Sequence, residues 1–261
     1  MTTDKLVRYA VSGGIATITL HSPGNRNALS ARLRSELSEG LEAASQDDGV
    51  RVVVLDHTGP VFCSGMDLKE TRGAAAEDQS VNEFPAILHR IVTSPKPVVA
   101  KVGGPARAGG VGLVAAADVA VAVRDATFAF TEVRIGVVPA VISVPVLPRL
   151  LPRAAHELFL TGESFDAERA ARIGLINMAV GTEALDTEVK RYTDMLCQGG
   201  PAALAATKDL LGQRAGSAEL AETFGAMLEL SARHFASEEG QEGMAAFAEK
   251  RKPNWVPADN P

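Results

Sequence analysis

The chain has 261 residues, of which 46% are hydrophobic and 22% are charged, and its formal net charge is −6. This composition indicates a folded globular protein and excludes a disordered one. The acidic balance argues against nucleic-acid binding, which needs a clustered basic surface, although a few cations could still gather around an anionic small ligand.

Strand patterns dominate the first half of the chain. Residues 7–20 predict a hairpin, because β-branched residues alternate on both sides of an SGG turn. Ser30 is placed to cap a helix that runs to about Ser45. Residues 50–56 are almost continuously apolar, which predicts a strand buried on both faces. Further predictions are a helix at 83–92 and strands at 97–102, 119–123 and 127–130.

The second half of the chain is mainly helical in pattern. A brief strand is predicted at 176–180, and long amphipathic segments follow from 183 to 250. Residues 71–82 lack any pattern and are expected to form a mobile surface segment. We therefore expect an α/β core over residues 1–198, followed by an α-helical C-terminal region, 199–261, that serves assembly.

Several features bear on location and on metals. The two cysteines, Cys63 and Cys197, are too few for a disulfide framework, and the five histidines fall in no metal-ligand spacing. No signal peptide is expected, because the N-terminus lacks an apolar run. Residues 113–123 are apolar but too short to cross a bilayer, and Asp118 interrupts them. These features predict a cytoplasmic protein without a metal and without a membrane partner.

A glycine-rich stretch at 103–115 invites comparison with the common nucleotide-binding motifs. Gly110, Gly112 and Ala115 match the dinucleotide pattern G-x-G-x-x-A. The context is wrong, because only about six helical residues precede the next strand, too few for a crossover helix. No phosphate-binding P-loop occurs, and Ser64 lacks the first glycine of a nucleophile elbow.

Two loops share one physical character. FCSGMD at 62–67 and RAGGVG at 107–112 each follow an apolar strand, contain small residues and lead into a helix. A helix N-terminus offers unpaired N–H groups and the positive end of a dipole, and glycine lets an oxygen approach them. Two such ends facing each other would form an oxyanion hole, although packing alone also explains small residues at two turns.

Six segments, in order along the chain, carry a resemblance to a known family. They are NRNAL (25–29), FCSGMDLKE (62–70), KPVVAKVGGPARAGGVGL (96–113), FTEVRIGVVP (130–139), LTGESFDAERAARIGLIN (160–177) and EGMAAFAEKRKPNW (242–255). Together they resemble the crotonase superfamily, also called the enoyl-CoA hydratase/isomerase family, over nearly the whole length. The resemblance implies a crotonase-like spiral of ββα units with an α-helical C-terminal region, assembled as a homotrimer or a dimer of trimers.

The resemblance also implies a site for an acyl-CoA substrate, with no resident cofactor because coenzyme A arrives with the substrate. The backbone N–H groups of Met66 and Gly109 would bind the thioester carbonyl oxygen and stabilise an enolate. The positions implied around the CoA nucleotide and pantetheine are Arg26, Ala28, Ser64, Asp67 and Leu68. Phe247 and Lys250 resemble a C-terminal pair that reaches the adenine and phosphate end, often from a neighbouring subunit.

The expected acid–base apparatus is half complete. Family hydratases use two glutamates, of which the second matches Glu132 and the first falls on Gly112. The absence of the first glutamate matters, because one general acid or base typically raises the reaction rate by about 10²- to 10⁴-fold. Residues 140–144, where the family usually has a glycine-rich run, should fill space with branched side chains. If Glu132 lies against the nearby valines, burial should raise its pKa.

Several reactions fit these residues. We expect hydration of a 2-enoyl-CoA, with Glu132 managing the C2 proton. An unidentified group or a backbone-held water would replace the missing carboxylate, and Ser143 and Thr131 are candidates for holding that water. An enoyl-CoA isomerase is the nearest alternative, because moving a double bond needs one base and no water. Hydrolysis, carbon–carbon cleavage, decarboxylation and a silent acyl-CoA-binding subunit remain open. Arg107 and Arg134 could clamp a substrate carboxylate or simply be solvated.

Overall fold

The computed structural model describes residues 5–71, 83–212 and 217–256. Nearly all of the segment predicted to be mobile, 71–82, lies outside the described residues. Within the described part, the order of strands and helices follows the predicted one closely, and the differences are small shifts at element ends and two short strands that were not predicted.

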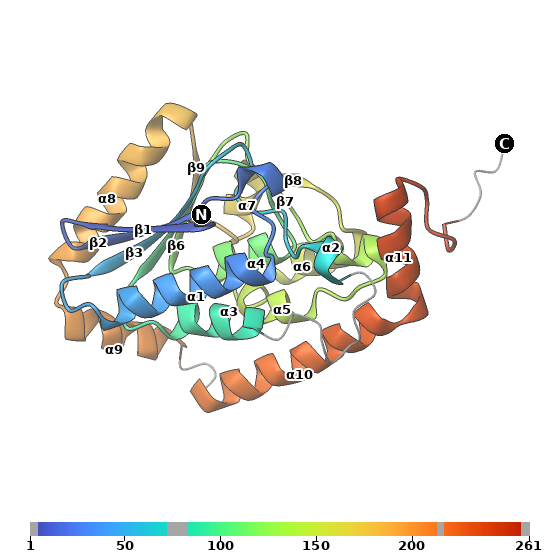
Figure 1. Ribbon diagram of the computed structural model, residues 1–261. Coiled ribbons are helices and arrows are strands. Elements are labelled where there is room, and N and C mark those ends of the chain that lie inside the picture. The colour runs from blue at the N-terminus through green and yellow to red at the C-terminus, as the bar shows by residue number, and fades with distance from the viewer. Residues whose placement is uncertain (1–4, 72–82, 213–216, 257–261) are drawn as a thin grey trace.

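A six-stranded sheet forms the centre of the molecule (Figure 1). In spatial order its strands are β1 (Val7–Ser12), β2 (Ile15–Leu20), β3 (Val52–His57), β4 (Val98–Val102), β6 (Val119–Val123) and β9 (Met178–Val180). β1 and β2 pair antiparallel as the predicted hairpin, and the following pairs are parallel. β3 begins two residues later than predicted, as does β9.

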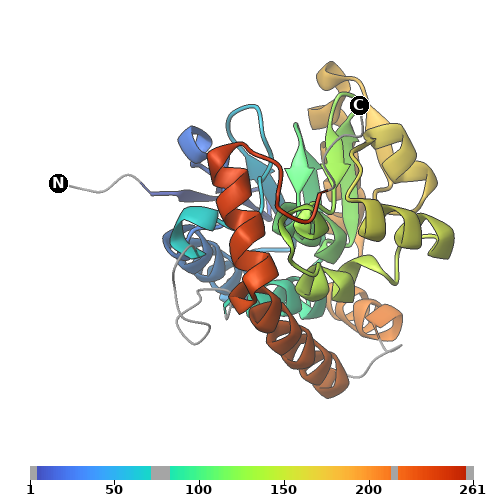
Figure 2. The same cartoon turned by 90° about the vertical axis from the view of Figure 1, so that its right-hand side faces the viewer.

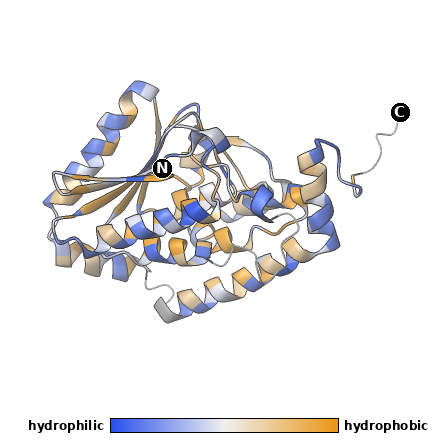
Figure 3. Ribbon diagram, viewed as in Figure 1, coloured by the Kyte–Doolittle hydropathy of each residue, from blue (hydrophilic) through white to orange (hydrophobic). Residues whose placement is uncertain are grey.

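Helices cover both faces of this sheet, which is why its valine-rich strands are buried on both sides. Figure 1 shows α8 (Leu185–Gln198) on one side, and α1 (Ala31–Gln46) and α3 (Phe84–Thr93) on the other. α1 begins as predicted, because the Ser30 Oγ accepts a hydrogen bond from the Leu33 N–H at 3.3 Å. Figure 3 shows the apolar residues gathered on the strands and on the inward faces of the helices.

A second, three-stranded sheet carries the chemistry-bearing loops. Its strands are β5 (Ala106–Arg107), β7 (Thr127–Ala129) and β8 (Phe165–Asp166). β5 and β7 are parallel, and β7 and β8 antiparallel. Only β7 was predicted, because two-residue strands are too short to show a period. Phe128 and Phe165 stack with ring centroids 5.8 Å apart and join the sheet to the core.

The smaller elements connect these sheets. They are η1 (Pro23–Asn25), α2 (Leu68–Thr71), α4 (Gly109–Ala116), η3 (Glu132–Ile135), α5 (Ala140–Val146), α6 (Pro152–Thr161), α7 (Ala167–Arg172) and η4 (Thr182–Ala184). The chain beyond α8 is helical as predicted, with α9 (Pro201–Gly212), α10 (Ser217–Ala236) and α11 (Glu238–Glu249).

The last two helices pack on the elements that follow the small sheet. α10 contacts α5 and α3, and α11 contacts η3. Figure 2 shows α10 and α11 running across one side of the molecule, in front of these elements. In the described part of the chain, no helix is long and apolar enough to cross a membrane, and no group of three or more His, Cys, Asp or Glu side chains is arranged to hold a metal ion.

Candidate active site

Three backbone segments run side by side into one region of the molecule. Ala106 in β5 forms a parallel bridge with Cys63 on one side and pairs in parallel with Phe128 of β7 on the other. Because the three segments run in the same direction, the residues that follow them emerge at one edge. The residues that emerge there and line a common cavity are Met66, Gly109 and Glu132.

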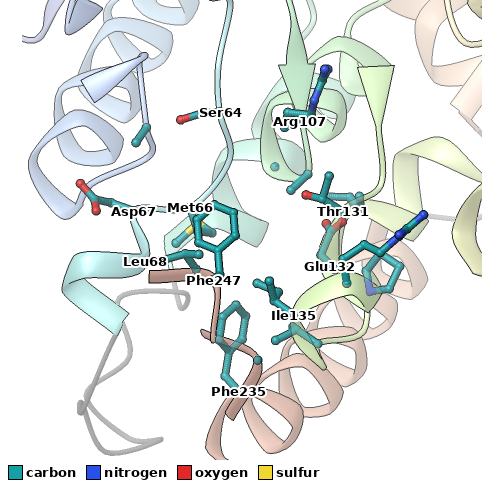
Figure 4. Close-up of a pocket in the computed structure, with 18 of the residues that line it drawn as sticks. Ser64, Met66, Asp67, Leu68, Arg107, Thr131, Glu132, Ile135, Phe235 and Phe247 are labelled. Atoms are coloured by element: carbon teal, nitrogen blue, oxygen red, sulfur yellow. The ribbon is translucent and has the colours of Figure 1, made fainter. Parts of the chain in front are cut away.

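The cavity has a volume of about 630 Å³ and brings together nearly all of the predicted site residues (Figure 4). Those that line it are Arg26, Ala28, Ser64, Met66, Asp67, Leu68, Gly109, Glu132 and Phe247. Lys250 does not line it, and Arg251 and Pro253 from the same C-terminal segment do. Phe247, which is 61% exposed, lines the cavity from α11 of the same chain.

Glycine lets the two predicted donor loops touch. Gly65 has a φ of +89°, and a Cβ there would lie 2.9 Å from the Ala108 Cβ and 3.5 Å from the Gly109 N. A Cβ on Gly110 would lie 2.5 Å from the Cys63 O. The small residues therefore serve close packing, and that packing also brings the segments carrying Met66 and Gly109 together.

The two backbone donors are available for a ligand. Gly109 is the first residue of α4, and the first N–H groups of a helix have no partner within it. Among the described residues, no loop hydrogen bond takes the Met66 N–H either. Ala108, just before the helix, has a φ of 48° and a ψ of −118°, a conformation that is unfavourable for a residue with a side chain. Its N–H donates to the Ala129 O at 3.0 Å, which fixes this strained turn to β7.

Asn27 organises the loop beside Ser64, and the sequence reasoning missed it. Arg26 and Asn27 both have positive φ, at 59° and 53°. The Asn27 side chain is fully buried, and its Nδ2 donates to the Thr58 O at 3.0 Å and the Val61 O at 2.8 Å. Asparagine tolerates the left-handed region and can replace backbone partners in turns, so its place in the NRNAL segment was the available signal.

Glu132 places a buried carboxyl oxygen at the start of η3. The residue is half-buried, but its Oε2 has no solvent contact and no hydrogen-bond partner. Val137 is 2% exposed and Val141 6% exposed, and both line the same cavity. Burial raises the pKa of Glu132 from 4.5 to about 7, as the sequence predicted. Figure 4 shows Glu132 beside Thr131, across the cavity from Met66 and Leu68.

The position of the missing carboxylate is closed by an aliphatic side chain. A Cβ on Gly112 would lie 2.8 Å from the Ile142 Cγ2 and 3.5 Å from the Leu88 Cδ1. Ile142 lines the cavity from α5, within the segment predicted to fill space. The wall contributed by α4 and α5 is therefore apolar and has no room for a side chain on residue 112.

The other predicted polar residues have different fates. The Ser143 Oγ donates to the Ala140 O at 2.6 Å, and Ser143 does not line the cavity, so the prediction that it holds a water is wrong. Thr131 does line the cavity. The Arg107 guanidinium donates to the Thr127 O at 2.6 Å and Oγ1 at 2.7 Å, which leaves it fixed to the small sheet rather than free to clamp a carboxylate. Arg134 lines the cavity and donates to the Thr161 O at 2.6 Å.

Ser231 of α10 is a second residue that the sequence did not reveal. It is 4% exposed and lines the cavity. A serine within an amphipathic helix carries no motif, so only the packing of α10 against α5 could have indicated it.

Comparison with known proteins agrees with this architecture. The sequence model of the enoyl-CoA hydratase/isomerase family matches residues 10–257. The chain belongs to the enoyl-CoA hydratase/isomerase family. Membership of this family supports an enzyme that acts on CoA thioesters, and it confirms the resemblance predicted from the six segments.

Relatives in this family cover almost the whole chain. A protein of Rhodobacter capsulatus named "Probable enoyl-CoA hydratase" is 37% identical over 258 residues, which are 96% of this chain and 97% of that protein. The carnitinyl-CoA dehydratase of Citrobacter koseri is 35% identical over 256 residues, 95% of this chain and 97% of that protein. The crystal structure of an enoyl-CoA hydratase from Mycobacterium avium is 47% identical, covers 97% of this chain and 100% of its own, and has a TM-score of 0.85. The predicted crotonase-like fold is thereby confirmed.

Proposed function

We propose that this protein is an enoyl-CoA hydratase, which adds water across the double bond of a 2-enoyl-CoA thioester. One observation carries the proposal: Glu132, with a pKa of about 7 and an unpaired buried Oε2, lines the same cavity as the Met66 and Gly109 backbone donors. A carboxyl group with a pKa near the working pH is suited to give and take protons. The names of the relatives support hydration over the other reactions of the family.

The two backbone N–H groups would act on the thioester carbonyl. When water attacks C3, the electron pair of the C2–C3 double bond moves toward C1, and negative charge develops on the carbonyl oxygen. Donors aimed at that oxygen stabilise this enolate, and each typically contributes about 2.7 to 4 kcal/mol. The donors are main-chain groups, so the chemistry does not depend on the side chain of Met66.

A single carboxyl group can complete the proton balance. Glu132 in its neutral form donates a proton from one oxygen to C2 as the enolate collapses. Its other oxygen accepts the proton released by the attacking water, so the neutral carboxyl is regenerated and no second glutamate is needed. The Thr131 hydroxyl, on the same wall as Glu132, is the group that we propose to orient the water.

The remaining site residues would bind coenzyme A. Ser64, Asp67 and Leu68 lie on the side of the cavity opposite Glu132, Arg26 and Ala28 also line it, and Phe247 lines it from α11. We propose that they hold the pantetheine and nucleotide, with Lys250 outside the cavity reaching the phosphates. We also propose that the protein forms a homotrimer or a dimer of trimers and that it is cytoplasmic. Its two free cysteines, Cys63 and Cys197, are compatible with a cytoplasmic location.

Isomerisation is the second candidate, and Ile142 favours it. Its side chain closes the space beside Gly112, so the wall across α4 and α5 offers no second carboxylate to activate a water. Moving a double bond from C3 to C2 needs one base that removes a proton from C2 and returns it to C4. Glu132 meets that requirement alone.

The test is to incubate the purified protein with crotonyl-CoA, a branched 2-enoyl-CoA and a 3-enoyl-CoA, following the absorbance of the conjugated thioester. Loss of conjugation with water added, abolished in Glu132→Gln and retained in the exposed control Glu163→Gln, is the result expected of a hydratase. Gain of conjugation from the 3-enoyl substrate alone would make the protein an isomerase. No change in absorbance with any of the three substrates would reject both the hydratase and the isomerase proposals.

A further inference from the structure

One end of the cavity is formed by helices rather than by the donor loops. α10 packs against α3 and α5, and each of these three helices contributes residues to the cavity wall. Phe84 comes from α3, Ile142 from α5, and Ser231 and Phe235 from α10. This end is therefore apolar except for the hydroxyl of Ser231.

The Ser231 hydroxyl lacks the partner that similar groups in this protein have. Hydroxyls in helices usually donate to a carbonyl one turn back, and those of Thr93, Thr161, Thr207 and Thr223 do so at 2.7 to 2.8 Å. Among the described residues, no hydrogen bond is found for the Ser231 hydroxyl, and its oxygen is not one of the solvent-excluded atoms that lack a partner, so water in the cavity can reach it although only 4% of the residue is exposed. A hydroxyl that only water satisfies can bind a polar group that displaces this water, so it is expected to bind an oxygen atom that enters the cavity.

The occupant should be neutral. Two of the arginines lining the cavity, Arg107 and Arg251, are fixed to their own neighbours, the first in the small sheet and the second by Glu242. No basic residue of α3, α5 or α10 lines the cavity within the described chain. A carboxylate at this end would be buried without a counter-charge, whereas a hydroxyl or carbonyl oxygen needs only one hydrogen bond.

We propose that Ser231 forms a subsite for a neutral oxygen atom on the part of the acyl chain remote from the thioester, so that the substrate is an oxygenated acyl-CoA bearing a hydroxyl or keto group. The proposal rests on the proposed function in one respect, because it places the acyl chain of a CoA thioester in this cavity. An entirely apolar chain that fills this end of the cavity would displace the water and leave the Ser231 hydroxyl without a partner. An oxygenated chain should therefore bind roughly 10-fold more tightly than its apolar counterpart.

Binding of saturated acyl-CoAs tests the subsite without turnover. The probes are one saturated chain and its derivatives with a hydroxyl or keto group at successive positions from C5 outward, measured by titration calorimetry. We expect at least one derivative to bind about 10-fold more tightly than the unsubstituted parent, and this preference to disappear in Ser231→Ala. Ser143→Ala, which removes a helix hydroxyl outside the cavity, is the matched control and should retain the preference.

A second variant guards against misfolding. Ser231→Cys keeps a similar volume with only a weak donor and should lose most of the preference. If no derivative binds more tightly than the parent, or if the preference survives in both Ser231 variants, the subsite is rejected, as it would be if the hydroxyl merely held a trapped water. If the preference appears although the hydration assay is negative, the subsite stands and the reaction must be revised. If no acyl-CoA binds at all, the proposed function and the subsite fail together.

Discussion

The two sides of the cavity are built from different parts of the polypeptide. On the donor side, main-chain N–H groups of Met66 and Gly109 are brought together by glycines that allow close contact between loops. On the acyl side, side chains from η3, α5 and α10 form the wall. These side chains also bury Glu132, which raises its pKa, and Ile142 fills the space beside Gly112. The donor side depends on backbone path, and the acyl side depends on side-chain identity.

This difference explains how one scaffold serves several reactions. A backbone donor survives most substitutions of its own residue, so the capacity to stabilise an enolate is retained while other residues change. A side-chain wall changes with every substitution. Relatives that match nearly the whole chain carry different names, enoyl-CoA hydratase and carnitinyl-CoA dehydratase.

The donor side should fail most severely when one methyl group is added to Gly65. In Gly65→Ala the new Cβ would meet the Ala108 Cβ at 2.9 Å and force apart the loops that carry the two donors. We expect kcat to fall by about 10²- to 10³-fold, the typical effect of losing one oxyanion donor. Gly13→Ala is the matched control, because Gly13 also has a positive φ, of 57°, but no atom within 4 Å of the new Cβ. Equal losses in both variants would mean that backbone strain, and not loop separation, is responsible.

On the acyl side, the buried carboxyl of Glu132 should make stability depend on pH. Its pKa is about 7 in the folded protein and ordinarily 4.5, so the folded state retains a proton that the unfolded state releases. Stability is therefore lost as pH rises from about 4.5 to about 7, by roughly 2 to 3 kcal/mol. Urea unfolding should show Glu132→Gln to be more stable than the wild type at about pH 8, with the advantage gone near pH 4. Glu163→Gln, which changes an exposed glutamate, is the control, and the same behaviour in both variants would contradict the assignment to Glu132.

The closure over Gly112 should appear as coupling between two residues. Gly112→Glu alone is expected to be destabilising, because its Cβ would lie 2.8 Å from the Ile142 Cγ2. Combining it with Ile142→Ala makes room, so the two changes together should cost about 1 to 2 kcal/mol less than their sum. Denaturant unfolding of the two single variants and the double variant measures this coupling. Additive costs would show that the two side chains do not compete for one space.

The smallest effect is expected where α11 supports η3. A Cβ on Gly243 would lie 2.2 Å from the Ile135 O, so Gly243→Ala should displace η3 and partly expose Glu132. We expect the inflection of kcat near pH 7, above which the neutral Glu132 carboxyl loses its proton and activity falls, to move down by about one pH unit. Gly225→Ala is the control, since Gly225 of α10 has no neighbour within 4 Å of a new Cβ. An unmoved inflection would show that α11 does not set the environment of Glu132.

The same division between backbone and side chains governs what the sequence could reveal. The donor loops and the main strands were predictable because glycine turns and β-branched runs are local signals, and Glu132 was found by its place in a motif. Ser231 and Asn27 were missed because their roles come from burial by elements distant in the sequence. The prediction for Ser143 was wrong because it assumed that nearness to Glu132 in sequence implies access to the cavity, whereas α5 turns that hydroxyl to the Ala140 carbonyl.

The support of η3 by α11 has a consequence for how the protein is made. Glu132 leaves the ribosome about 110 residues before Gly243, which at ordinary rates of synthesis is roughly 5 to 20 s earlier. During that interval the nascent chain already contains the loops of Met66 and Gly109 and the carboxyl group of Glu132, but not α11, the helix that contacts η3. We therefore expect the final environment of Glu132 to form only when translation is nearly complete, because in a chain released early η3 would lack its contact with α11.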